Sequence, residues 1–286
     1  MKYEVENLLT LGHELGEGPL WSAEERALYW VDILAGNVHR MKYGESSYET
    51  FSLGAPVGSI GFRERGGFIA ALKNGLHFWN VGQETPEFLC NPEAHKPHIR
   101  FNDGAVDRKG RFWTGTTDDN GNSCLYRYDP DGTLHTMETG ITCSNGIGWS
   151  PDNRTMYYSD SQVFTVYAYD FDLESGEIAN RRVFLRPEQG EPDGLTVDSE
   201  GCVWIAMWDG WRVDRYDPDG KLMVSIPMPV QYPTCPMFGG DNLDELFVTS
   251  AWLLLGEERR HTQPQAGDLF RIRTDVKGIP EPKFAG

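Results

Sequence analysis

A recurring motif constrains the fold of this chain more than any other feature of its sequence. The pattern D-x-x-G-x-x-W occurs at residues 107–113 and again at residues 198–204, and looser versions stand at residues 22–29, 151–157 and 240–247. Each copy is typical of a tight polar turn followed by a strand that opens with an aromatic residue. Short apolar segments precede these turns, and further strand-like segments follow them. Each copy therefore predicts a small antiparallel sheet.

The spacing of the copies predicts a closed ring. Units that start at Gly18, Gly61, Gly104, Gly146, Gly194 and Gly239 are 43, 43, 42, 48 and 45 residues apart. Six such units, each with four short antiparallel strands, are the pattern of an all-β, six-bladed β-propeller. We expect one such domain over residues 1–286. We also expect the segments 2–11 and 267–277 to pair in one blade and so close the ring.

Charge and cysteine content exclude several classes of protein. The chain has 43 acidic and 26 basic residues and a formal charge of −17, which argues against nucleic acid and against an anionic membrane as partners. The N-terminal segment has no apolar core of a signal peptide. Five cysteines without a C-x-x-C pair predict reduced thiols, not disulfides or a structural zinc site. We expect a cytoplasmic monomer or weak homodimer.

Polar residues recur where the first strand of a unit begins, and in a propeller these positions meet in the central channel. Four of the six units have a carboxylate or carboxamide followed by glycine, whereas units two and six have no strong ligand there. The residues are Glu17, Asn102 with Asp103, Asn145, and Asp193. Such oxygen donors suit a hard divalent cation, and few protein ligands leave open positions, as in catalytic metal sites.

Five segments carry a resemblance to a known family. They are L-G-E-G-P-L-W around Glu17, R-F-N-D-G from Arg100, G-R-F-W-T-G-T from Gly110, S-N-G around Asn145 and P-D-G-L around Asp193. In this order they resemble the regucalcin, gluconolactonase and luciferin-regenerating enzyme family over nearly the whole chain. Members of that family are six-bladed propellers that bind one divalent metal in the channel, and many hydrolyse sugar lactones to aldonic acids.

The resemblance implies roles for individual residues. The family's metal ligands correspond to Glu17, Asn145 and Asp193, with Ca²⁺ as the expected ion and Mg²⁺, Mn²⁺ or Zn²⁺ as alternatives. Its substrate-binding arginine and asparagine correspond to Arg100 and Asn102. A glutamate that contacts the substrate in several members is replaced here by Asn120, so Asp118 or Asp119 could take over that contact.

The expected activity is metal-dependent hydrolysis of a small-molecule sugar lactone, an aldono-1,4- or 1,5-lactone. The metal acts as a Lewis acid on the carbonyl, and Asp193 is the candidate base that takes a proton from water. A hydroxide on the metal is the alternative base. Two other functions stay open: a non-catalytic propeller that binds calcium or a partner, and a phosphotriesterase-like hydrolase. The polar channel favours an enzyme, because a scaffold would not need it.

Overall fold

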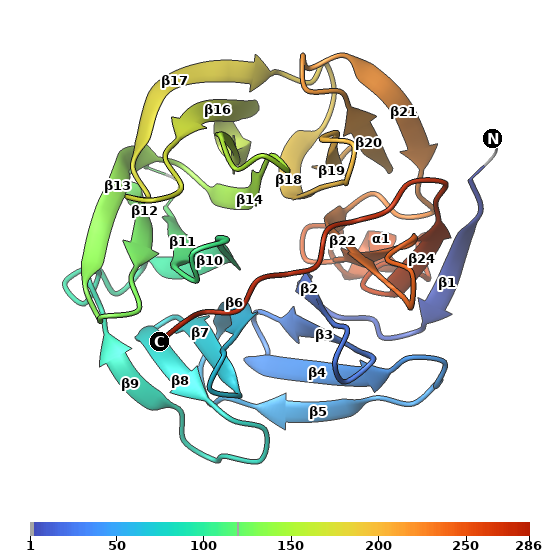
Figure 1. The fold of residues 1–286 in the computed structure, drawn as a ribbon. Coiled ribbons are helices and arrows are strands. Elements are labelled where there is room, and N and C mark those ends of the chain that lie inside the picture. The colour runs from blue at the N-terminus through green and yellow to red at the C-terminus, as the bar shows by residue number, and fades with distance from the viewer. Residues whose placement is uncertain (1–2, 119) are drawn as a thin grey trace.

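Six four-stranded antiparallel sheets surround a central channel like the blades of a propeller (Figure 1). The structure is a computed structural model, and it describes residues 3–118 and 120–286. In each blade the strand that lies at the channel contacts the corresponding strand of both neighbouring blades, so these strands form a complete ring. The expected all-β, six-bladed propeller is confirmed.

Five blades are built from four consecutive strands each, ordered from the channel outward. Blade 1 contains β2 (Gly16–Ser22), β3 (Ala27–Asp32), β4 (Asn37–Lys42) and β5 (Glu49–Ser52). Blade 2 contains β6 (Val57–Phe62), β7 (Phe68–Leu72), β8 (Gly75–Trp79) and β9 (Glu87–Cys90). Blade 3 contains β10 (Arg100–Val106), β11 (Phe112–Thr117), β12 (Ser123–Tyr128) and β13 (Leu134–Ile141).

The remaining blades follow the same plan. Blade 4 contains β14 (Ser144–Trp149), β15 (Thr155–Asp160), β16 (Thr165–Phe171) and β17 (Ile178–Leu185). Blade 5 contains β18 (Glu191–Val197), β19 (Val203–Trp208), β20 (Arg212–Tyr216) and β21 (Leu222–Pro227). Blade 6 contains β22 (Pro233–Gly239), β23 (Glu245–Ser250), β24 (Leu269–Arg273) and β1 (Val5–Leu9). The two short helices in the described part are η1 (Ser161–Val163) and α1 (Glu257–Arg260), and neither is long or apolar enough to cross a membrane.

The D-x-x-G-x-x-W motif has a direct physical explanation in the structure. In blade 5, one carboxylate oxygen of Asp198 accepts hydrogen bonds from the backbone N–H groups of Glu200 and Cys202, and the other accepts one from the Trp204 indole. Arg215 forms an ion pair with the same buried carboxylate. In blade 3, Asp107 bonds the residues two, four and six positions further on in the same way. The motif therefore fixes the turn and the first aromatic residue of the next strand together.

Pairing of the two ends of the chain closes the ring. Strand β1 pairs antiparallel with β24, with Val5 opposite Ile272, so blade 6 takes its outer strand from the N-terminal segment and its other three strands from the C-terminal part. This confirms the expected pairing of the two segments. All five cysteines are free thiols, as expected from their spacing.

The segment after β24 runs across the channel from blade 6 to the opposite side of the ring (Figure 1). It reaches the turns that join the first and second strands of blades 2 and 3, where Phe284 and Ala285 donate backbone hydrogen bonds to Phe62 and Gly110. The Arg108 side chain bonds the backbone of Pro280 in the same segment. One end of the channel is therefore covered by the chain itself, and the polar residues lie toward the other end.

Candidate metal centre and active site

All six inner strands have a register irregularity at the same level of the channel. The pairing of β2, β6, β10, β14, β18 and β22 with the second strand of each blade shifts near its start. Such bulges turn side chains away from the regular alternation of a strand, and they occur frequently beside active sites. Here the residues in or next to the bulges point into the channel and form a ring of polar groups.

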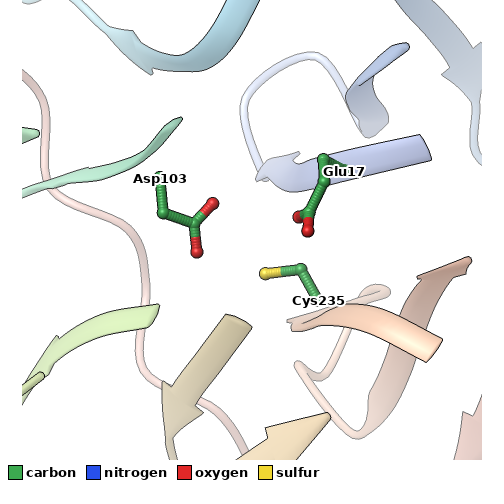
Figure 2. A group of neighbouring side chains, drawn as sticks. All are labelled: Glu17, Asp103 and Cys235. Atoms are coloured by element: carbon green, nitrogen blue, oxygen red, sulfur yellow. The ribbon is translucent and has the colours of Figure 1, made fainter. Parts of the chain in front are cut away.

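Three of these residues come together at one point. Ligand atoms of Glu17, Asp103 and Cys235 all lie within 4.8 Å of one another, and all three residues are buried. Figure 2 shows them converging from three different strands, with the Cys235 sulfur directed at the gap between the two carboxylates. Beneath this group, a cavity lined by Asp103, Cys235 and Glu281 extends toward the C-terminal segment.

Asp193 belongs to the same electrostatic group. Burial, followed by repulsion from Glu17 and Asp103, raises the pKa of Asp193 well above its ordinary value. Burial and then Asp103 raise the pKa of Glu17, and burial raises the pKa of Asp103 to about 7. In the described part of the chain, neither the Asp103 nor the Asp193 carboxylate has a hydrogen bond or ion pair, so three buried acids face one another with little compensation.

The amide side chains lie beside this acidic group in one hydrogen-bonded chain. Arg100 donates to Asn102 Oδ1 at 2.5 Å, and Asn102 Nδ2 donates to Asn145 Oδ1 at 2.8 Å. Asn145 in turn donates to Ser161 Oγ at 2.7 Å. Because Ser161 fixes its nitrogen, the Asn145 oxygen is aimed away from η1 toward Asn102. The structure thus brings together Glu17, Asn145, Asp193, Arg100 and Asn102; their roles remain predictions.

Asp118 and Asn120 lie apart from that chain, in the loop between β11 and β12. Asp118 accepts hydrogen bonds from the backbone and side chain of Asn120 and from Asn122. These bonds, that from Asn122 foremost, lower the pKa of Asp118 to about 2. The carboxylate thereby organises its own loop, and no hydrogen bond in the described residues joins it to Arg100 or Asn102. Asp119, the other residue considered for a substrate contact, lies outside the described residues.

Sequence reasoning placed Asp103 among the oxygen donors of the channel but gave it no role, and it did not consider Cys235 as a ligand. Asp103 follows Asn102 directly and stands within the bulge of β10, so the two adjacent residues take different positions in the channel. In five blades, one channel residue lies five positions before a residue at the following turn. The pairs are Glu17 and Ser22, Asn102 and Asp107, Asn145 and Ser150, Asp193 and Asp198, and Cys235 and Gly240. Counting five residues back from the turn after β22 would therefore have found Cys235. Gly239, which the repeat spacing gave as the start of the sixth unit, is instead the last residue of β22.

The residues fit a divalent cation. Carboxylate oxygens of Glu17, Asp103 and Asp193 are the donors that such ions prefer. The Asn145 side chain adds a neutral oxygen, and the positive charge of Arg100 lowers the pKa of all three acids. An ion at this point would offset the repulsion that now keeps the acids partly protonated, and its binding would release protons.

Metal-free protein should show a pH-dependent stability difference between Asp103→Asn and the wild type. The unfolded Asp103 ionises near pH 4, whereas the folded residue keeps its proton up to about pH 7, so the folded state binds more protons in that window and the wild type loses stability as pH rises. The advantage of Asp103→Asn should therefore grow by about 2 to 3 kcal/mol between pH 5 and pH 8. Urea unfolding in chelator measures it.

Asp118→Asn is the matched control for this measurement. The pKa of Asp118 is lowered to about 2, so that carboxylate is charged in both the folded and unfolded states from pH 5 upward. Its substitution should change stability by nearly the same amount at every pH in this range, because the titrating partner of Asp118, His98, is largely exposed and contributes little. If the stability difference between Asp103→Asn and the wild type were as independent of pH as that of Asp118→Asn, Asp103 would be ionised throughout this pH range.

Fold and site together define a six-bladed propeller with a buried acidic group in its channel. The family model described as SMP-30/Gluconolactonase/LRE-like region matches residues 15–252. A 6-deoxy-6-sulfogluconolactonase from Pseudomonas putida is 40% identical over 279 residues, which cover 95% of each chain. Regucalcin from Xenopus laevis is 35% identical over 295 residues, which cover 99% of each chain.

Solved structures show the same similarity. A luciferin-regenerating enzyme superposes with a TM-score of 0.91 at 31% identity, covering 99% of this chain and 100% of that one. A calcium-binding protein named regucalcin, from Agrobacterium tumefaciens, superposes with a TM-score of 0.94 at 27% identity, covering 99% and 98%. The chain belongs to the SMP-30, gluconolactonase and luciferin-regenerating enzyme family, which confirms the resemblance seen in its motifs.

Proposed function

We propose that this chain hydrolyses a sugar lactone to the aldonic acid, with one divalent cation bound in the channel by Glu17, Asn145 and Asp193. The observation that carries the proposal is the set of three buried acids without adequate counter-charge. The names of relatives support the substrate class: one is a 6-deoxy-6-sulfogluconolactonase and another, from Bacillus subtilis, a sugar lactone lactonase at 34% identity.

The channel residues have two roles in the proposed reaction: some supply or stabilise charge, and others orient the substrate. When bound, the cation supplies Lewis acidity at the lactone carbonyl. Arg100 and Asn102 hold sugar hydroxyls or the ring oxygen and so orient the carbonyl toward the acids. A carboxylate takes a proton from the attacking water; Asp193 is the expected base. Asp103 is a second candidate, because its pKa of about 7 matches the pH at which a general base works best.

A lactone panel tests the proposal. Chain stripped of metal by chelation is assayed for acid release from aldono-1,4- and 1,5-lactones, including 6-deoxy-6-sulfogluconolactone, before and after addition of Ca²⁺, Mg²⁺, Mn²⁺ or Zn²⁺. We expect hydrolysis only when a cation is restored. Cation binding without hydrolysis of any lactone would favour a non-catalytic calcium-binding propeller, and hydrolysis of a phosphotriester alone would favour the third function considered.

Arg100→Met should change substrate and cation affinity in opposite directions. Loss of charged hydrogen bonds to the substrate should raise KM about tenfold or more. Loss of a positive charge beside Glu17, Asp103 and Asp193 should tighten cation binding, because the guanidinium now competes for the same acids. Steady-state kinetics and calorimetric cation titration measure the two effects. Arg100→Lys, which keeps the charge, should leave cation affinity close to that of the wild type; an unchanged KM in Arg100→Met would contradict the substrate role.

A further inference from the structure

The sixth blade contributes a sulfur atom to a channel in which blades 1, 3, 4 and 5 contribute oxygen ligands. Cys235 lies in the bulge of β22, where pairing with β23 shifts between Pro233 and Pro236. Its side chain points into the gap between the Glu17 and Asp103 carboxylates (Figure 2). Cys235 therefore occupies the position that corresponds to Asn145 and Asp193 in blades 4 and 5.

Packing holds the thiol at this point. A Cβ atom on Gly194 would lie 2.4 Å from the Cys235 sulfur, so only glycine after Asp193 leaves room for the sulfur against β18. The thiol is thus confined between the strand that carries Glu17 and the strand that carries Asp193. Its hydrogen bonding is weak, with the Pro236 carbonyl oxygen as a 3.9 Å acceptor.

Burial gives this group the character of a site and not of a surface cluster. Cys235 is 7% exposed, Asp103 is 6% exposed and Glu17 is 3% exposed. The Asp103 carboxylate is aimed into the gap and makes no hydrogen bond or ion pair with any residue that the structure describes. A buried charged group without a partner is costly, and a cation shared with the sulfur would remove that cost.

Sulfur changes which cation the group prefers. Thiolate is a ligand for Zn²⁺ and similar ions, whereas Ca²⁺ and Mg²⁺ take oxygen ligands. Zinc bonds sulfur at about 2.3 Å and carboxylate oxygen at about 2.0 to 2.2 Å. In a tetrahedral site these bond lengths place sulfur and oxygen about 3.6 Å apart, so donor atoms that lie within 4.8 Å of one another would have to approach by up to about 1 Å to contact one such ion.

We propose that Cys235 is a thiolate ligand of the channel cation and biases the site toward Zn²⁺, Co²⁺ and Cd²⁺ over Ca²⁺ and Mg²⁺. As the sulfur–metal bond forms, the S–H bond breaks and its proton passes to solvent. Glu17 and Asp103 supply the oxygen ligands nearest to the sulfur. The inference rests on the cation site of the proposed function, and it is independent of which substrate is hydrolysed.

Cobalt and cadmium titrations test the sulfur bond directly. The full chain, stripped of metal and reduced with a phosphine, should develop a sulfur-to-metal charge-transfer absorption that saturates at one ion per chain. Cys235→Ser should lack this absorption yet keep the visible ligand-field bands of bound Co²⁺. Cys202→Ser is the matched control, because Cys202 is an equally buried thiol in the turn after β18, and it should behave like the wild type.

Competition binding experiments measure the preference of the site for Zn²⁺ over Ca²⁺. Cys235→Ser should weaken Zn²⁺ binding by about 10- to 100-fold, a loss of the size known even for groups that only support a metal ligand. Ca²⁺ affinity should stay as in the wild type. Equal losses for Zn²⁺ and Ca²⁺ would mean that the substitution damaged the site in general, and would overturn the proposal.

Zinc X-ray absorption on the unaltered chain needs no variant and therefore does not depend on the folding of Cys235→Ser. One sulfur scatterer at about 2.3 Å is expected, and a shell of oxygen and nitrogen alone would overturn the proposal. The lactone panel separates the two proposals. Hydrolysis by a chain with an oxygen-only shell refutes the thiolate and leaves the lactonase standing, whereas a sulfur shell without hydrolysis does the reverse.

Discussion

Asp193→Asn is expected to lower kcat/KM for lactone hydrolysis by about 10³-fold, even at saturating cation. The substitution removes a proposed cation ligand and the expected base at once, and the loss corresponds to about 4 kcal/mol of transition-state stabilisation. The same substitution should raise the melting temperature of the metal-free protein. It removes one of three mutually repelling acids, Glu17 and Asp103 being the others, so activity and stability should change in opposite directions.

The control for Asp193→Asn is Asp241→Asn. Asp241 is an exposed carboxylate in the turn after β22, where it forms an ion pair with the equally exposed Arg26. Its substitution should leave both kinetics and metal-free stability nearly unchanged. Activity of Asp193→Asn within about tenfold of the wild type, or about 1.4 kcal/mol, would show that the site has been placed wrongly. A lowered melting temperature without metal would show that the acids do not repel one another as inferred.

Asp198→Ala should lower the free energy of unfolding by about 3 to 5 kcal/mol, the usual cost of breaking a buried ion pair from one side. The carboxylate is fully buried. Its removal leaves the Arg215 guanidinium without its buried partner and the Trp204 indole N–H without an acceptor. Urea unfolding monitored by tryptophan fluorescence measures the change.

Asp217→Ala measures the contribution of the backbone hydrogen bonds in a turn separately from that of the buried ion pair. Asp217 accepts hydrogen bonds from the backbone N–H groups two and four residues further on, as Asp198 does, but among the described residues it has neither an indole nor an arginine partner. Its substitution should cost only about 1 kcal/mol. If both variants lost the same free energy of unfolding, the aspartate of the motif would stabilise the fold through the turn alone and not through its bonds to the core.

The fold could be predicted from the sequence because its repeating unit is enforced locally. Asp107 and Asp198 each bond residues two, four and six positions ahead, so the contacts that define a turn appear as a short readable motif. The blade closure was also predictable, since the two end segments had no other sheet to complete. Blade 2 shows the limit of this prediction, because its first turn lacks the aspartate and only the spacing of the units indicates the blade.

The site was less predictable because bulges decide which side chains face the channel. Simple alternation along β10 cannot say that Asn102 joins the amide chain while its neighbour Asp103 joins the acids. The family motifs indicated Glu17, Asn145 and Asp193, yet they gave no reason to consider a cysteine in blade 6. Asp118 was a candidate because it stands near Asn120, where several related proteins have a glutamate, but it accepts hydrogen bonds from Asn120 and Asn122 within its own loop.

The closure of blade 6 also has a consequence for synthesis on the ribosome. Asn7, in β1, donates a hydrogen bond to Asp268, the residue before β24, across 261 residues of sequence. At bacterial and eukaryotic translation rates of about 5 to 20 residues per second, β1 waits for roughly 13 to 50 s before its partner emerges. During that time its edge is open to other strands. Nascent chains should therefore need protection at β1, and slower translation of the residues between β1 and β24 would prolong that exposure.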